Sequence, residues 1–265
     1  MSARRISAER LAVRAAQLDE RDQAVLAMLA AVKLATGTQL RRAVSGDNSL
    51  AGQRAARRQL ARLVRWRMIG RLERRQGGPG AGSDSWTYGL DTAGQRLLVP
   101  GRSGRRPHLP RPASWQHVLV GAEIYTRLVE ALRGGQRHLQ CWQGEPAAWR
   151  DYVTGYGERQ RLKPDAFTLV SGGGYEDVSF LEVDIGTQSR PVIRQKLYAY
   201  QRYAATGEEQ RRLDGVFPRV VFITTTLARH AVLVDLLGEL PADAWRLFAV
   251  GLVDDAARLL SGDQS

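Results

Sequence analysis

The second half of the chain contains two neighbouring apolar segments that carry acidic side chains at one end. Asp165 opens the first segment, and Glu182 and Asp184 end the second, after a turn of three consecutive glycines. Successive side chains of a β-strand alternate faces, so Glu182 and Asp184 point the same way while Leu181 and Val183 point into a core. The pattern predicts a hairpin in which three carboxylates meet, an arrangement that suits Mg2+ or Mn2+. The alternative is solvated acids at strand ends.

Length and composition are those of a globular protein. The chain has 265 residues, 43% of them apolar, and six Trp, which is enough for one large or two ordinary domains. Its single cysteine, Cys141, can form no internal disulfide and has no companion for a zinc site. The start of the chain is rich in arginine and the apolar run 24–32 is short, so we expect no membrane span and a soluble, cytoplasmic protein.

The formal net charge of +12 is distributed unevenly along the chain. Residues 1–113 contain 22 Arg or Lys against 8 Asp or Glu, whereas the remainder contains 17 against 19. A strongly basic segment suggests that it binds a polyanion such as DNA. The near-neutral remainder carries the acidic cluster, so the two parts are expected to have different functions.

Residues 99–113 read as a linker between two domains. They contain four prolines, two glycines and four arginines, with almost no apolar periodicity. The chain is therefore predicted to divide into a first domain at residues 1–98, the linker at 99–113, and a second domain at 114–265.

The first domain is predicted to be a winged helix-turn-helix. Asp19 can cap a first helix, a short second helix follows at about 38–44, and a third runs from about Leu50 to Arg67. Segments 68–75 and 84–90 then read as a β-hairpin with a long tip. One face of the third helix would lie in the major groove of double-stranded DNA, and it carries Arg54, Arg57, Arg58, Arg62 and Arg65. The alternative is a solvated arginine face on an ordinary helix.

The second domain is predicted to hold a mixed sheet flanked by helices. Periodicity places helices at 115–132, 191–205 and 231–240, and strands at 138–142, 165–170, 178–184, 220–225 and 247–253. The fold class is thus a two-domain chain of the α+β and α/β kind.

This element order, with Pro164-Asp165 opening one strand and Glu182 on the next, resembles the PD-(D/E)xK nuclease fold. The resemblance implies that Asp165 and Glu182 bind magnesium, with Asp184 as a third ligand. In that family a lysine lies two residues beyond the glutamate, and here Asp184 occupies its place. Lys196, with Tyr200 four residues on, is then the substitute expected to act in catalysis together with Asp184. The alternative is that Lys196 forms an inert salt bridge with Asp184.

The chain as a whole resembles the replication-relaxation family of actinobacterial and other Gram-positive plasmids and integrated mobile elements. The residues that carry the likeness are Pro164-Asp165, the run from Phe180 to Thr187, Lys196-Leu197-Tyr198-Ala199-Tyr200, Tyr203 and Val221-Phe222-Ile223-Thr224. The resemblance implies a DNA-binding protein that acts in replication, relaxation or mobilisation, with a nuclease-like domain that is active or degenerate. It also implies plasmid replication proteins or relaxases as partners, and a homodimer as one state. The alternative is a transcription or copy-number regulator whose nuclease-like domain is only a scaffold.

Overall fold

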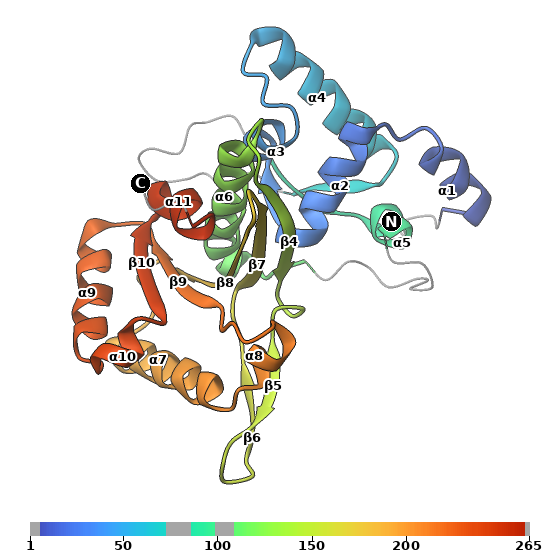
Figure 1. Cartoon of the computed structure of the whole chain (residues 1–265). Helices are drawn as coiled ribbons and strands as arrows, with labels where there is room; N and C mark the ends of the chain where they lie inside the picture. Colours follow the sequence, from blue (N-terminus) through green and yellow to red (C-terminus); the bar gives the residue numbers. More distant parts are fainter. Residues whose placement is uncertain (1–5, 73–85, 99–108, 263–265) are drawn as a thin grey trace. The chain divides into compact units, whose positions relative to one another are not determined.

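The computed structural model describes residues 6–72, 86–98 and 109–262 (Figure 1). The chain is of the mixed α/β kind and divides into two compact units, residues 1–126 and 127–265, which are treated separately below. No helix of the described residues is long and apolar enough to cross a membrane.

The first unit is built from helices around a small sheet. Its helices are α1 (Ala8–Ala15), α2 (Glu20–Val32), α3 (Gly37–Val44), α4 (Leu50–Arg65) and α5 (Thr92–Leu98), followed by the short η1 (Pro112–Ser114). Its strands are β1 (Leu34–Thr36), β2 (Ile69–Leu72) and β3 (Thr87–Leu90). They pair antiparallel in the order β1-β3-β2.

Local signals determine where these helices begin. Asp19 caps α2 in a reciprocal capping box with Asp22, as predicted from the sequence, and Thr36 caps α3 with Gln39 in the same way. Ser49 caps α4 by accepting from the backbone N–H of Gly52. Apolar side chains of α2, α3 and α4 then meet in a buried core that includes Val25, Leu29, Leu40, Leu60 and Leu63.

The hairpin after α4 is confirmed for the strands that the structure describes, β2 and β3. The predicted tip and the outer parts of both predicted strands lie outside the described residues, as do residues 99–108 of the predicted linker. The third strand, β1, was not predicted, since three residues are too few to give a period of two.

Helix α6 (Trp115–Leu132) spans the boundary between the two units. The compact units divide the chain within α6, whereas the domain bounds drawn from the linker, which assign all of α6 to the second domain, stay a prediction. Side chains of α3 contact the first turns of α6. Arg42 forms an ion pair of 2.8 Å with Glu123, and Gln39 donates to the carbonyl of Leu119 and to Glu123. The first turns of α6 are thereby attached to the first unit.

The second unit contains a five-stranded mixed sheet and a separate hairpin. The sheet strands are β4 (His138–Gly144), β7 (Ala166–Gly172), β8 (Tyr175–Asp184), β9 (Arg219–Thr224) and β10 (Phe248–Leu252), in the order β10-β9-β8-β7-β4. The hairpin consists of β5 (Arg150–Val153) and β6 (Arg159–Leu162). The helices are α7 (Arg190–Ala205), α8 (Glu208–Arg212), α9 (Leu227–Gly238), α10 (Ala242–Trp245), η2 (Val253–Asp255) and α11 (Ala256–Leu260).

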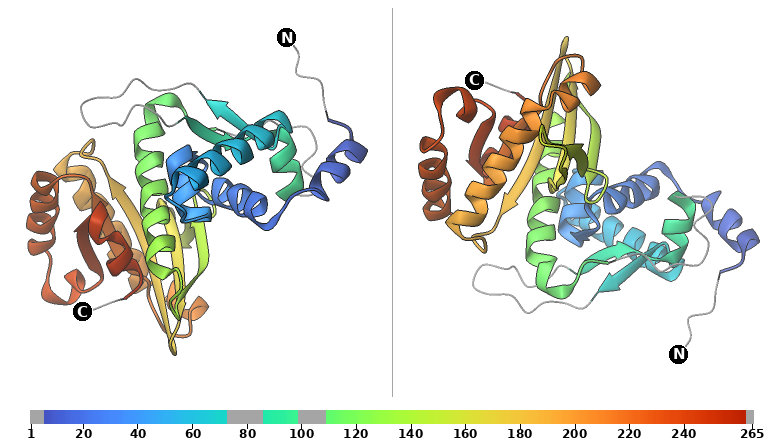
Figure 2. Two further views of the ribbon diagram at one scale, coloured as in Figure 1. Left: turned by 90° about the horizontal axis from the view of Figure 1, so that it is seen from above. Right: turned by 90° about the horizontal axis from the view of Figure 1, so that it is seen from below.

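The sheet is parallel on one side of β8 and antiparallel on the other. Strands β8, β9 and β10 run parallel because α7 and α9 carry the chain back between them, while β7 and β4 join as antiparallel neighbours. Helices α7 and α9 cover one face of the sheet (Figures 1 and 2). There Phe180, Phe222 and Phe248 pack against Leu197 and Leu233. This face also receives Glu182 and Asp184, which alternate with the apolar side chains of the opposite face.

Candidate functional site

The acidic ends of β7 and β8 lie next to one another under α7. The register pairs Ala166 with Leu181, which brings Asp165 beside the end of β8. Asp165 donates its backbone N–H to the carbonyl of Leu181 (3.0 Å), and its Oδ2 accepts from the N–H of Val183 (2.7 Å). Its side chain therefore extends the ladder between the two strands. Glu182 is 2% exposed and Asp184 is 4% exposed, so both carboxylates are buried.

Two side chains of α7 hold the carboxylate of Glu182. The ammonium of Lys196 pairs with Oε2, and the hydroxyl of Tyr200 donates to Oε1 at 2.6 Å. Residues four apart lie on the same face of a helix, so the spacing of Lys196 and Tyr200 is what lets both reach one carboxylate. The structure thus brings together the glutamate, lysine and tyrosine that were singled out from the sequence. The lysine pairs with Glu182 directly.

Burial and charge set the protonation behaviour of this cluster. Burial raises the pKa of Glu182 to about 7; the charge of Lys196 opposes the rise and that of Asp165 adds to it. Burial alone would lower the pKa of Lys196, but the negative charges of Glu182, Asp165 and Asp184 outweigh it, and the pKa is raised. Burial, followed by the neighbouring Glu182, raises the pKa of Tyr200 well above its usual value. Lys196 and Tyr200 are therefore both protonated at neutral pH.

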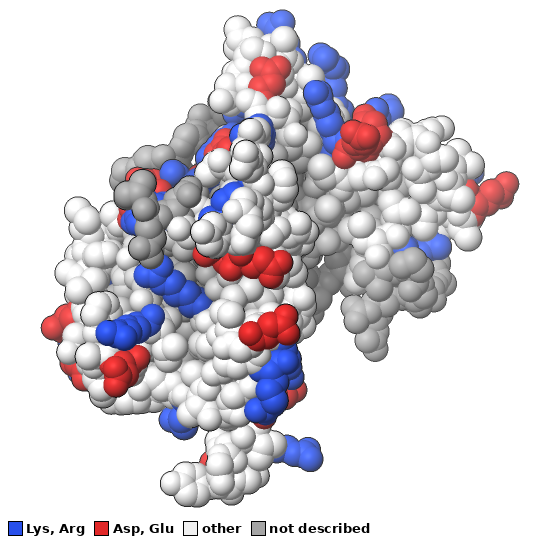
Figure 3. All heavy atoms as spheres, viewed as in Figure 1, with Lys and Arg blue, Asp and Glu red and all other residues white. Residues whose placement is uncertain are grey.

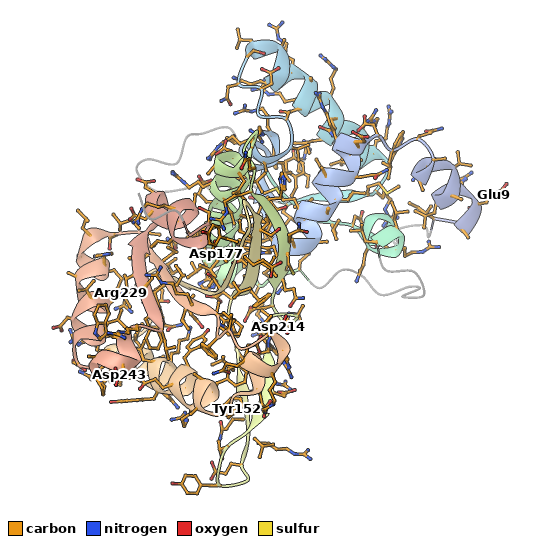
Figure 4. All side chains as sticks on the ribbon, viewed as in Figure 1. Glu9, Tyr152, Asp177, Asp214, Arg229 and Asp243 are labelled. Atoms are coloured by element: carbon orange, nitrogen blue, oxygen red, sulfur yellow. The ribbon has the colours of Figure 1, made fainter. Side chains whose placement is uncertain are left out.

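Asp184 anchors the loop that follows β8. It accepts from the N–H of Gly186 at 2.7 Å and from Arg229 of α9, whose Nε and Nη2 lie 2.9 and 2.7 Å from Oδ2. Arg229, labelled in Figure 4, also donates to the carbonyl of Gln188 at 2.7 Å. One buried ion pair therefore fixes both the loop 185–189 and the start of α9.

Arg229 was not predicted from the sequence, although a signal for it exists. The parallel pairing of Thr224 with Asp184 places the end of β9 beside the end of β8. Arg229 lies in the first turns of the helix that begins there, so an arginine at that position can reach Asp184.

The predicted set of three metal ligands is not assembled in the part of the chain that the structure describes. There, no group of three or more His, Cys, Asp and Glu side chains is arranged to hold a metal ion. Asp184 is committed to Arg229 and Gly186, which leaves Asp165 and Glu182 as neighbouring carboxylates. Two carboxylates still fit Mg2+, which commonly takes one or two of them and completes its shell with waters and substrate phosphates. They fit Mn2+ through the same oxygen ligands.

A second buried ion pair joins β5 to α8. Arg150 of β5 donates through Nε to both oxygens of Glu209, at 3.1 and 3.0 Å, and its Nη1 donates to the carbonyl of Ala148 at 2.8 Å. Tyr203 also donates to Glu209, and burial together with that bond raises the pKa of Tyr203. The hydrogen-bonding groups of Arg150, Tyr203 and Glu209 bond to one another, so we assign them a structural role. Lys163, close to Asp165 in sequence, has its ammonium 5.1 Å from the ring centre of Trp149.

In the first unit, the arginines of α4 fall into two groups. Four are exposed, and basic side chains stand over α4 at the top of Figure 3. They are Arg54, Arg57, Arg58 and Arg65. Among the residues that the structure describes, no acidic side chain forms an ion pair with any of these four arginines.

Arg62 differs from the other arginines of α4. Helical spacing predicts it on the DNA-facing side, but its guanidinium pairs with Asp22, which is fully buried, and lies 3.3 Å from Asp19. Gln59 donates to the same Asp22 at 3.1 Å. The hydrogen bond to Asp22 is the main reason that the pKa of Arg62 is raised. These contacts tie α4 to α2, so Arg62 does not belong to the row of four exposed arginines.

Comparison with known proteins assigns the chain to a family. The family model described as Replication-relaxation matches residues 26–220, which is well over half of the chain. The protein therefore belongs to the Replication-relaxation family, and membership implies a role related to plasmid replication. No curated protein and no solved structure matches the chain.

Proposed function

We propose that this protein is a DNA-binding protein of a plasmid or integrated mobile element that acts in replication, relaxation or mobilisation. The observation that carries the proposal is the row of four exposed arginines on α4, within a unit of a strongly basic protein. Family membership supports the same setting.

In this proposal the first unit is a winged helix-turn-helix. Helix α4 lies in the major groove of double-stranded DNA, and the β2–β3 hairpin is the wing beside it. Arg54, Arg57, Arg58 and Arg65 would meet the phosphates and the base edges of that groove. In this hairpin the Arg71 guanidinium lies 4.2 Å from the ring centre of Trp86, which orders a further cation that would lie close to the DNA backbone.

We propose further that the second unit is a PD-(D/E)xK nuclease-like domain. Support comes from Asp165 and Glu182 at neighbouring strand ends with Lys196 on the glutamate. Asp165 and Glu182 would hold Mg2+ or Mn2+, which when bound supplies charge stabilisation at the phosphate undergoing hydrolysis. Lys196, protonated and 29% exposed, would neutralise the phosphate charge, and Tyr200 would keep Glu182 in position. Asp184 and Arg229 would hold the loop beside the site.

A second candidate function is that of a transcription or copy-number regulator whose second unit is only an interaction or dimerisation scaffold. The observation that favours it is the charge balance of the site. Lys196 already neutralises Glu182, and Arg229 already neutralises Asp184, so the fold needs no metal ion to hold these carboxylates.

Metal binding and plasmid nicking distinguish the two candidates. If the site is catalytic, Glu182→Gln should abolish Mg2+ or Mn2+ binding in calorimetry, while Lys196→Ala should retain or strengthen it because a competing cation is gone. Both variants should lose nicking of supercoiled plasmid by at least 100-fold, since each lacks a group that the hydrolysis needs. Glu176→Gln, at an exposed acid of the same unit, serves as the control and should behave as wild type. Absence of both metal binding and nicking in the wild-type protein would leave the regulator as the better description.

DNA binding itself is tested on the first unit's arginines in the full chain. The triple variant Arg54→Ala, Arg57→Ala, Arg58→Ala should bind duplex DNA at least 10-fold more weakly at moderate salt, because up to three phosphate or base contacts are lost. Fluorescence anisotropy with a labelled duplex measures this. Unchanged affinity would move the DNA-binding surface away from α4.

A further inference from the structure

The hairpin formed by β5 and β6 has one buried and one exposed face. Tyr152, labelled in Figure 4, and Leu162 point into the core of the second unit and are 4% and 5% exposed. The pairs of Asp151 with Arg161 and of Val153 with Arg159 lie on the other face and are exposed. In Figure 1 the hairpin extends beyond the sheet of its own unit.

The exposed face of the hairpin carries three cations at alternate positions, Arg159, Arg161 and Lys163. Alternate residues of a strand lie about 6.8 Å apart, close to the separation of successive phosphates along one DNA strand. Two of the cations are held in place, because the Arg161 guanidinium and the Lys163 ammonium lie 5.7 and 5.1 Å from the ring centre of Trp149.

Three acids lie near these cations and limit the net charge of the surface. Asp151 accepts from Nη2 of Arg161 at 2.9 Å and so orients that guanidinium. Glu158 lies next to the tip, and Glu208 lines the same hollow of about 610 Å3 as Arg159 and Lys163. Arg159 and Lys163 are thus the cations best placed to meet an outside anion.

The tip of the hairpin presents an aromatic ring to solvent. Tyr156 is 98% exposed and stands between Gly155 and Gly157. The turn is defined by hydrogen bonds from the N–H of Thr154 to the carbonyl of Glu158, at 2.9 Å, and from the N–H of Gly157 to the carbonyl of Thr154, also at 2.9 Å. Packing within the protein does not explain an aromatic ring at this position, whereas stacking against a flat partner would explain it.

The hairpin leads directly into the acidic site. Only Lys163 and Pro164 separate the end of β6 from Asp165, which lies beside Glu182. A strand held along the exposed face of β6 would therefore run towards Asp165 and Lys196.

We infer that the β5–β6 hairpin binds single-stranded DNA, with Tyr156 stacking on a base and Arg159, Arg161 and Lys163 following the phosphates. This inference rests on the proposed function, since it adds a second DNA contact to that of α4. An unpaired strand is the partner that fits, because a tyrosine can stack on a base face only where the base is free of its neighbours in a duplex. Alternating cations beside an exposed ring are the combination that single-strand binding surfaces use.

The test compares two DNA probes with the full-length protein: a blunt duplex, and the same duplex with an oligo-dT tail. Wild type should bind the tailed probe more tightly. Tyr156→Ala should weaken binding to the tailed probe by roughly 5- to 150-fold, the effect of losing one stacked base, and leave blunt-duplex binding unchanged. Arg159→Gln with Lys163→Gln should lower the salt slope for the tailed probe by about 1.4, since each single-strand phosphate contact contributes about 0.7.

Matched controls make the outcome specific. Tyr175→Ala removes a tyrosine that is 75% exposed at the turn between β7 and β8, and Arg219→Gln with Arg246→Gln removes two exposed charges from the same unit. Neither should affect binding of the tailed probe. The inference is overturned if Tyr156→Ala has no effect, if Tyr175→Ala has the same effect, or if wild type gains nothing from the tail while still binding the duplex. If the tail adds nothing but the triple variant at Arg54, Arg57 and Arg58 loses duplex binding, the inference about the hairpin fails and the proposed function stands. If wild type binds neither probe, both the inference and the proposed function fail.

Discussion

Replacing Arg62 with alanine should lower the free energy of unfolding by about 2–3 kcal/mol, because it removes the cation from a buried carboxylate. Asp22 has no exposed surface and receives Arg62, Gln59 and the N–H of Asp19. The expected loss is below the range of about 3–5 kcal/mol for broken buried pairs, because Gln59 and the backbone N–H still bond to Asp22 and because the Arg62 side chain is 34% exposed.

The stability of the Arg62→Ala variant is measured by urea denaturation, with the exposed Arg58→Ala of the same helix as control. Arg58→Ala should change the free energy of unfolding by less than about 0.5 kcal/mol. Affinity for duplex DNA should show the reverse order, because Arg58→Ala should lose more affinity than Arg62→Ala. Equal stability of the two variants would mean that the Arg62–Asp22 pair contributes nothing, and Arg62 would return to the DNA-facing group.

Glu182→Gln should make the protein more stable at pH 8 than wild type, and the advantage should shrink towards pH 4. The folded protein raises the pKa of Glu182 from 4.5 to about 7, mainly through burial. A carboxyl whose pKa is raised on folding contributes most to stability below its unfolded pKa and loses that contribution as pH rises through the folded pKa. Glutamine has no such dependence, so the difference between the two proteins should grow by up to about 3 kcal/mol between pH 4 and pH 8.

The experiment is urea denaturation at several pH values in the presence of a chelator. In wild type Lys196 stays charged over this range, because the neighbouring carboxylates raise its pKa from 10.5, and so it does not contribute to the wild-type slope. Glu158→Gln, at an exposed position, controls for a general effect of removing one acid. A Glu182→Gln curve parallel to that of wild type would show that burial does not disfavour the charged form of Glu182.

Much of the fold could be predicted because its signals are local. The cap at Asp19, the proline in the first turn of α7 and the alternation in β8 each act within a few residues of where they appear, and the corresponding elements are present in the structure. The spacing of Lys196 and Tyr200 likewise predicted that both would lie on one face of their helix, and both reach Glu182.

What could not be predicted depends on pairs distant in sequence. Asp184 was predicted to be a metal ligand, but in the structure it pairs with Arg229, which lies 45 residues further along the chain. Arg62 shares the helical spacing of the exposed arginines and differs only in having Asp22 within reach. The β5–β6 hairpin was not among the predicted strands, because its exposed face is charged and its inward residues include Arg150, which is buried against Glu209. In each case the deciding partner lies on another element.

The salt dependence of duplex binding tests the central claim most directly. The logarithm of the wild-type association constant should fall linearly with the logarithm of salt concentration, with a slope of about 0.9 for each phosphate neutralised. The triple variant at Arg54, Arg57 and Arg58 should show a slope smaller by up to about 2.7, while Arg62→Ala keeps the wild-type slope. An unchanged slope in the triple variant, or a wild type with no salt dependence, would contradict the claim that this Replication-relaxation family member binds DNA through α4.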